Sequence, residues 1–126
     1  MSKVSNHQEL AEALCAALQA DADEAAVAAF VDGLYDVDGI EDEELRAIVT
    51  TVRDDTKLMF AKGRQRLAGA TVAISGLERE GSKYITVLAA SGGPTLSIAV
   101  DDVYESDGAL HTRDTISINL VKPIAG

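Results

Sequence analysis

The stretch GRQRLAGATVAISG, residues 63–76, contains the change of pattern that decides the fold. Before Gly69 apolar residues recur every three or four positions, the period of an amphipathic helix, and after it they alternate every two, the period of a strand. The pattern predicts an α+β protein, with a helical region over residues 1–68 and a β domain over residues 69–126. The chain has 126 residues, which is enough to bury a core, and we expect the two regions to fold as one cooperative unit.

On the N-terminal side of this boundary the sequence predicts three helices. The first covers residues 7–19 and the second covers residues 23–35, and we expect these two to form a helical hairpin. A break follows at residues 36–39. Asp38 and Glu41 have the spacing of a capping box and predict the start of a long third helix of about 25 residues.

The expected third helix has an apolar seam that fits two roles. A seam with spacings of four and three serves either a coiled coil or ordinary packing within the chain. We favour ordinary packing, because threonine, glycine and arginine occupy three of its seven positions. A helix of about 25 residues is about 37 Å long, and two helices of about 13 residues are too short to cover it. We expect the β domain or another subunit to cover the rest. The seam consists of Leu45, Val49, Val52, Thr56, Met59, Gly63 and Arg66, with Ile48, Phe60 and Leu67 beside it.

The β domain contains four segments in which apolar residues alternate with small or polar ones. They lie near residues 72–74, 85–87, 96–100 and 116–120. Short turns that contain glycine separate them, which implies antiparallel pairing. The dipeptide Asp107-Gly108 is typical of a tight hairpin. These features predict a small antiparallel β-sheet, sandwich or partly open barrel.

The net charge of −10 is divided unevenly along the chain. Residues 1–55 contain fourteen acids and three bases, residues 56–77 contain four bases and no acid, and residues 78–126 contain seven acids and four bases. The overall acidity argues against nucleic acid as a direct ligand, because binding a phosphate backbone requires basic patches. No apolar run in the sequence reaches the about 20 residues that span a membrane. Since the N-terminal stretch is polar and predicts no secretory signal, we expect a cytoplasmic location, or a virion if the source is a phage.

The acidic residues between the second and third expected helices are the best candidates for specific chemistry. Asp36, Asp38 and Glu44 are weak candidates for calcium ligands, because the segment partly matches a helix–loop–helix calcium site. When Gly39 takes position six of that pattern, leucines fall at positions one and twelve, where oxygen ligands are required. We therefore interpret the segment as an acidic turn that leads into a helix.

No pattern of catalytic residues stands out elsewhere in the sequence. The two histidines, His7 and His111, are far apart and lack the cysteines of a zinc site. The single cysteine, Cys15, excludes an internal disulfide. We therefore expect neither an enzyme nor a cofactor.

These observations favour a non-enzymatic structural or assembly subunit, such as a phage virion component, that acts through protein–protein contacts in a homo-oligomer or a larger assembly. We expect the basic segment of one copy, residues 57–66, to face an acidic surface, residues 32–44, of the next copy. The alternatives are a small acidic inhibitor or sequestering protein that caps a basic partner, and a ligand-binding β domain with a helical lid. The predicted interface residues are Val52, Met59 and Phe60 for apolar contact and Lys62, Arg64 and Arg66 for charge pairing.

Overall fold

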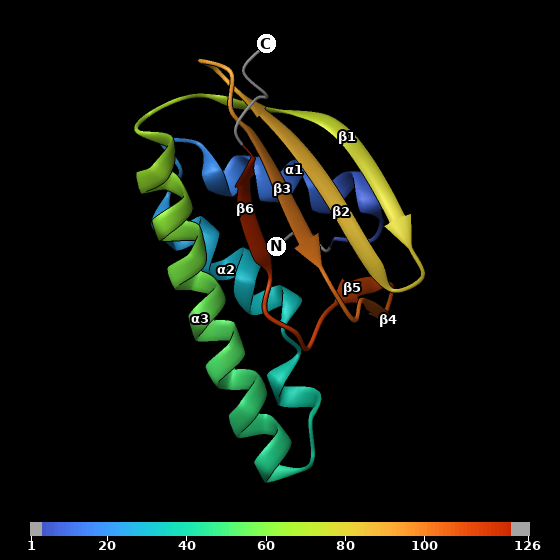
Figure 1. Cartoon of the computed structure of the whole chain (residues 1–126). Coiled ribbons are helices and arrows are strands. Elements are labelled where there is room, and N and C mark those ends of the chain that lie inside the picture. The colour runs from blue at the N-terminus through green and yellow to red at the C-terminus, as the bar shows by residue number, and fades with distance from the viewer. Residues whose placement is uncertain (1–3, 122–126) are drawn as a thin grey trace.

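The computed structural model describes residues 4–121, so residues 1–3 and 122–126 of the two predicted regions lie outside the described part. Within residues 4–121, three α-helices precede an open four-stranded antiparallel sheet and a separate two-stranded hairpin (Figure 1). The predicted α+β fold with a long third helix is confirmed. The elements are α1 (His7–Leu18), α2 (Glu24–Leu34), the 3₁₀ turn η1 (Val37–Gly39), α3 (Glu43–Leu67), β1 (Val72–Glu80), β2 (Lys83–Ala90), β3 (Thr95–Val100), β4 (Tyr104–Ser106), β5 (Ala109–His111) and β6 (Ser117–Val121).

Each α-helix begins where an asparagine or aspartate side chain accepts a hydrogen bond from the first turn. For α3 this residue is Asp42, whose Oδ1 accepts the backbone N–H of Glu44 at 2.9 Å. The predicted capping box of Asp38 and Glu41 is therefore wrong. Asp38 lies inside η1, and the chain leaves that turn before the helix starts.

The four-stranded sheet has the order β1-β2-β3-β6, and its neighbouring strands are antiparallel. A bulge between Ile74 and Gly76 shifts the register of β1 against β2. Between β3 and β6 the chain forms the β4–β5 hairpin, whose turn residues Asp107 and Gly108 have φ angles of 54° and 73°. Positive φ at both turn positions favours an Asp-Gly pair, so the predicted tight hairpin is confirmed.

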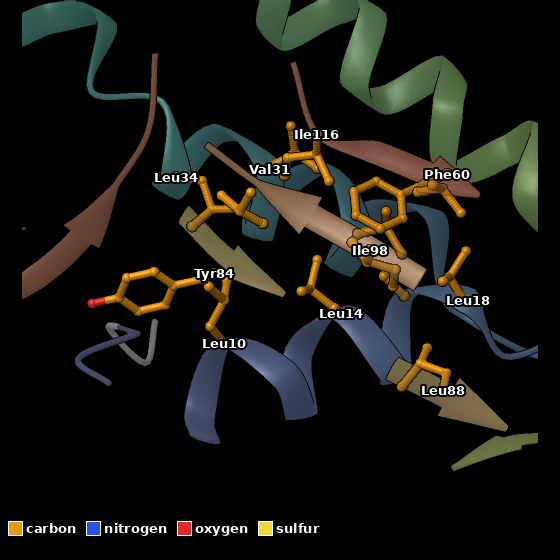
Figure 2. Packing of buried hydrophobic residues seen from close by; sticks show 14 of the residues in the cluster. Leu10, Leu14, Leu18, Val31, Leu34, Phe60, Tyr84, Leu88, Ile98 and Ile116 are labelled. Atoms are coloured by element: carbon orange, nitrogen blue, oxygen red, sulfur yellow. The ribbon is translucent and has the colours of Figure 1, made fainter. Parts of the chain in front are cut away.

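The helices cover one face of the sheet (Figure 1). Along β2 and β3, buried side chains on the helix side alternate with half-buried or exposed ones on the other side. One cluster of buried residues contains members of the helices and of the sheet. Figure 2 shows members of this core packed together, among them Leu14 and Leu18 of α1, Phe60 of α3, Leu88 of β2 and Ile98 of β3.

The inner stripe of α3 follows the spacing that its sequence predicts. Its buried residues are Val49, Thr56, Phe60, Gly63 and Leu67. They face α1, α2 and β6 of the same chain, so the preference for ordinary packing is confirmed. The N-terminal half of α3 extends beyond the sheet and lies beside α2 and η1 (Figure 1). The sheet therefore does not cover the N-terminal half of α3.

A buried polar contact joins α2, α3 and the segment before β6. The Tyr35 hydroxyl lies 2.8 Å from Thr56 Oγ1 and donates to the Asp114 carbonyl oxygen at 2.6 Å. Because a carbonyl only accepts, the Tyr35 hydrogen is used there, and the Thr56 hydroxyl donates to Tyr35 or to the Val52 carbonyl at 2.9 Å. Burial raises the pKa of Tyr35 to about 12.

The side chain of Gln19, the residue after α1, covers the outer edge of β1 at Val72. Gln19 Nε2 donates to the Val72 carbonyl at 2.7 Å, and Gln19 Oε1 accepts the Val72 N–H at 3.3 Å. The Gln19 amide thus makes the two hydrogen bonds that a neighbouring strand would make with this residue. The Cys15 thiol lies 3.4 Å from the same carbonyl, and partial burial raises its pKa.

Candidate functional site

The three candidate calcium ligands do not gather into a cluster. Among residues 4–121, no group of three or more His, Cys, Asp or Glu side chains is placed to hold a metal ion. Asp36 lies over Gly39 instead, since a Cβ on Gly39 would be 2.5 Å from Asp36 Oδ2. Asp38 is exposed on η1, and Glu44 lies in the first turn of α3, where its carboxylate suits the positive end of the helix dipole.

The two histidines have separate structural contacts. The ring centroids of His7 and Tyr84 are 4.8 Å apart, and burial together with the nearby Arg79 lowers the pKa of His7. His111 Nδ1 lies 3.1 Å from the Gly33 carbonyl oxygen, which only accepts, so Nδ1 carries the hydrogen. This bond holds the β4–β5 hairpin against α2.

Two side chains of the basic segment are engaged within the chain. Lys57 Nζ on α3 lies 2.8 Å from Asp32 Oδ1 on α2. Arg64 donates from its guanidinium group to the Ala17 carbonyl at 2.8 Å, at the C-terminal end of α1. A cation at this end of a helix stabilises it through the helix dipole. Arg64, which the sequence analysis assigned to charge pairing, thus already has an internal partner.

The other two basic side chains, Lys62 and Arg66, are exposed. Within the described part of the chain they form no ion pair or hydrogen bond. They border a crevice of about 40 Å³ between α3 and β6, together with Met59 and Leu120. A crevice of this size holds no more than a few water molecules. Lys62 and Arg66 are therefore available to another chain.

The predicted apolar interface residues lie on the inner side of α3 or at its margin. Phe60 is 0 % exposed and belongs to the core, where it cannot reach another chain, so we remove it from the candidate surface. Val52 and Met59 are half-buried and pack against the core from its margin.

Two large apolar side chains stand on the outward side of α3. Ile48 is 60 % exposed and Leu58 is 59 % exposed. Sequence reasoning placed Ile48 beside the inner seam and missed Leu58. A second run of residues with spacings of four and three contains both Ile48 and Leu58 and lies one position before the seam. This run is the sequence pattern that could have indicated the outward side. These two residues and the free bases Lys62 and Arg66 make α3 the strongest candidate surface.

A groove of about 570 Å³ lies between α1, α2 and the β4–β5 hairpin. Phe30 and Leu110 supply its larger apolar side chains, and Asp36 and His111 are among its polar ones. Its size and mainly apolar lining are typical of small-molecule sites. The groove is the feature that the alternative of a ligand-binding domain would use.

No family model, no curated protein and no solved structure matches this chain. Among the described residues, no helix combines the length and the apolar character needed to cross a membrane. Within residues 4–121, the surface features on which a function can be based are the outward side of α3, the exposed acids of residues 38–44 and the groove.

Proposed function

We propose that this protein is a non-enzymatic subunit that acts through protein–protein contacts, with the outward side of α3 as its contact surface. The observation that carries the proposal is the exposure of Ile48 and Leu58, about three helical turns apart on a helix that already buries its other side. Full burial of such a side chain is worth about 1.5–3 kcal/mol, so covering the part of Ile48 or Leu58 that is still exposed stabilises a complex by about 1–2 kcal/mol before the costs of association. A partner that covers both residues would gain this energy twice.

The charges of α3 favour one orientation of the partner. Exposed acids occupy residues 41–44 at its start, and the free bases Lys62 and Arg66 lie near its end. Opposite charges at the two ends of one surface steer and align association more than they strengthen it. This arrangement supports contact with a second copy, whose acidic end can meet the basic end of the first.

Light scattering over a series of protein and salt concentrations tests the proposal. We expect a mass above that of the 13.2 kDa chain, rising with protein concentration. Leu58→Ser should shift the mass toward the monomer. The control Val121→Ser, which removes a side chain that is 50 % exposed on β6, should not. A monomer at every concentration would contradict self-association through α3.

A second candidate function is the capping of a basic partner by the acidic surface. Asp38, Glu41, Asp42, Glu43 and Glu44 are all exposed, and they lie at the end of the molecule that extends beyond the sheet (Figure 1). Titration with a polylysine peptide separates the two functions. A monomer that binds the peptide and releases it in salt supports capping, whereas a self-associating chain without peptide binding supports assembly.

A further inference from the structure

One stripe of α3 is exposed over most of the length of the helix. Its side chains have spacings of four and three residues, the spacing that keeps one helix face against a partner helix. In Figure 1, α3 forms one side of the molecule and the sheet lies on its other side. The outward stripe consists of Glu44, Ile48, Thr51, Asp55, Leu58 and Lys62, all of them exposed.

When two outward stripes run in opposite directions, an acid of one copy faces a base of the other, and apolar side chains face each other. When two copies of α3 are aligned antiparallel about a two-fold axis beside residue 53, Glu44 of each copy faces Lys62 of the other. The same alignment places Ile48 opposite Leu58. We infer that two copies of the chain pair through the outward stripe in this antiparallel register. The inference rests on the proposed function, because it names the partner of the same helix surface.

A parallel alignment of the outward stripe is unfavourable. It would place Glu44 against Glu44, Asp55 against Asp55 and Lys62 against Lys62, and opposed like charges repel. In the antiparallel register Asp55 faces Thr51, a neutral side chain whose hydroxyl hydrogen is donated to the Ala47 carbonyl oxygen at 3.1 Å, so no like charges are opposed at this position. The charge pattern therefore selects the antiparallel direction.

The paired stretch from Glu44 to Lys62 is about 27 Å long at 1.5 Å per residue. Each contact occurs twice, because a two-fold axis relates the copies. Val52 and Met59, half-buried at the margin of the stripe, extend the apolar area around Ile48 and Leu58. A contact of one helix pair is small for a protein interface, so we expect a reversible dimer whose population depends on concentration.

Exchange of the charges at Glu44 and Lys62 tests the register. In sedimentation velocity, Glu44→Lys and Lys62→Glu should each weaken the dimer about tenfold or more, because each creates two like-charge contacts. Mixing the two variants in equal amounts should restore pairing as a heterodimer, and the double variant should restore it within one species. The matched control is Glu24→Lys, which makes the same charge change at an exposed acid in the first turn of α2 instead of α3, and it should change the dissociation constant less than about threefold.

The outcomes separate the register from the proposed function. A dimer that forms in the parent chain but is not restored by the charge exchange overturns the register and leaves self-association standing. A parent chain that stays monomeric at every concentration overturns both. Circular dichroism of each variant should match that of the parent chain, because Glu44 and Lys62 are exposed and their replacement removes no buried side chain.

Cysteine cross-linking gives a second measurement that does not depend on charge. With Cys15 replaced by serine, Ile48→Cys and Leu58→Cys chains should form a disulfide with each other under mild oxidation. Leu58→Cys alone should not, because position 58 of one copy lies about 15 Å along the helix from position 58 of the other, and a disulfide needs Cα atoms within about 7 Å. Rapid cross-linking of Leu58→Cys alone would overturn the antiparallel register.

Discussion

Replacing Tyr35 by phenylalanine removes one oxygen atom from the buried contact between α2, α3 and the segment before β6. Tyr35 is 2 % exposed, and its hydroxyl group lies 2.8 Å from Thr56 Oγ1 and 2.6 Å from the Asp114 carbonyl oxygen. A neutral hydrogen bond contributes about 1 kcal/mol net, and phenylalanine keeps the packing of the ring. We therefore expect Tyr35→Phe to lower the free energy of unfolding by about 1–2 kcal/mol.

Urea unfolding followed by circular dichroism measures this loss. With an m-value of about 2 kcal/mol per molar urea, the midpoint should fall by about 0.5–1 M. The protein concentration must be held fixed, because self-association adds stability. Thr56→Val should also destabilise the chain, and the double variant should lose less than the sum of the single variants, since both remove the same contact.

The matched control is Tyr104→Phe on β4. The Tyr104 hydroxyl forms no hydrogen bond with any other residue of the described range 4–121, so its removal should leave the midpoint within about 0.2 M of the parent. An unchanged midpoint for Tyr35→Phe would refute the reasoning. Strict additivity of Tyr35→Phe and Thr56→Val would show that the two hydroxyl groups do not act together.

Phe60→Ala should lower the free energy of unfolding by about 3–5 kcal/mol, because it empties a fully buried site, and a loss below 1 kcal/mol in urea would place Phe60 outside the core. Gly33→Ala should raise it by about 0.5–1 kcal/mol, since the new Cβ meets no atom within 4 Å, and thermal unfolding checks the sign. Gly63→Ala should fall short of that gain, because its Cβ would lie 2.9 Å from Leu18 Cδ2. The free energy of unfolding should fall as the pH rises from about 10 to about 12. Tyr35 loses its proton near pH 10 in the unfolded chain, whereas its pKa in the folded chain is about 12. The stabilisation by the protonated Tyr35 is therefore complete below pH 10 and lost above pH 12. Tyr35→Phe should flatten that part of the pH profile.

Local sequence patterns were sufficient to predict most of the secondary structure. The 3.6-residue period carried by Val49, Phe60 and Leu67 is a property of the helix itself, so it predicts α3 without knowledge of its neighbours. The Asp107-Gly108 turn is equally local, because the two residues adopt the positive φ angles that a tight hairpin needs.

The candidate surface depended on contacts between distant parts of the chain, which sequence patterns do not encode. Ile48 and Val52 have similar hydrophobicity, and only the packing of α3 against the core decides that Ile48 is exposed and Val52 half-buried. Arg64 illustrates the same limit, because its partner, the Ala17 carbonyl, is 47 residues away. Spacing therefore predicted that α3 has a buried side, but it assigned the core residue Phe60 to an interface and did not indicate that Arg64 has a partner within the chain.

The Gln19 amide on Val72 bears on how the protein behaves when it is concentrated. An open strand edge is a template on which further copies add strand by strand, the first step toward fibrils. At Val72 the two outward backbone groups are already bonded to Gln19, and the bulge after Ile74 and the charged residues 78–80 interrupt the rest of this edge. Templated growth is therefore opposed at β1, and we expect this edge of the sheet not to start fibrils when the protein is concentrated.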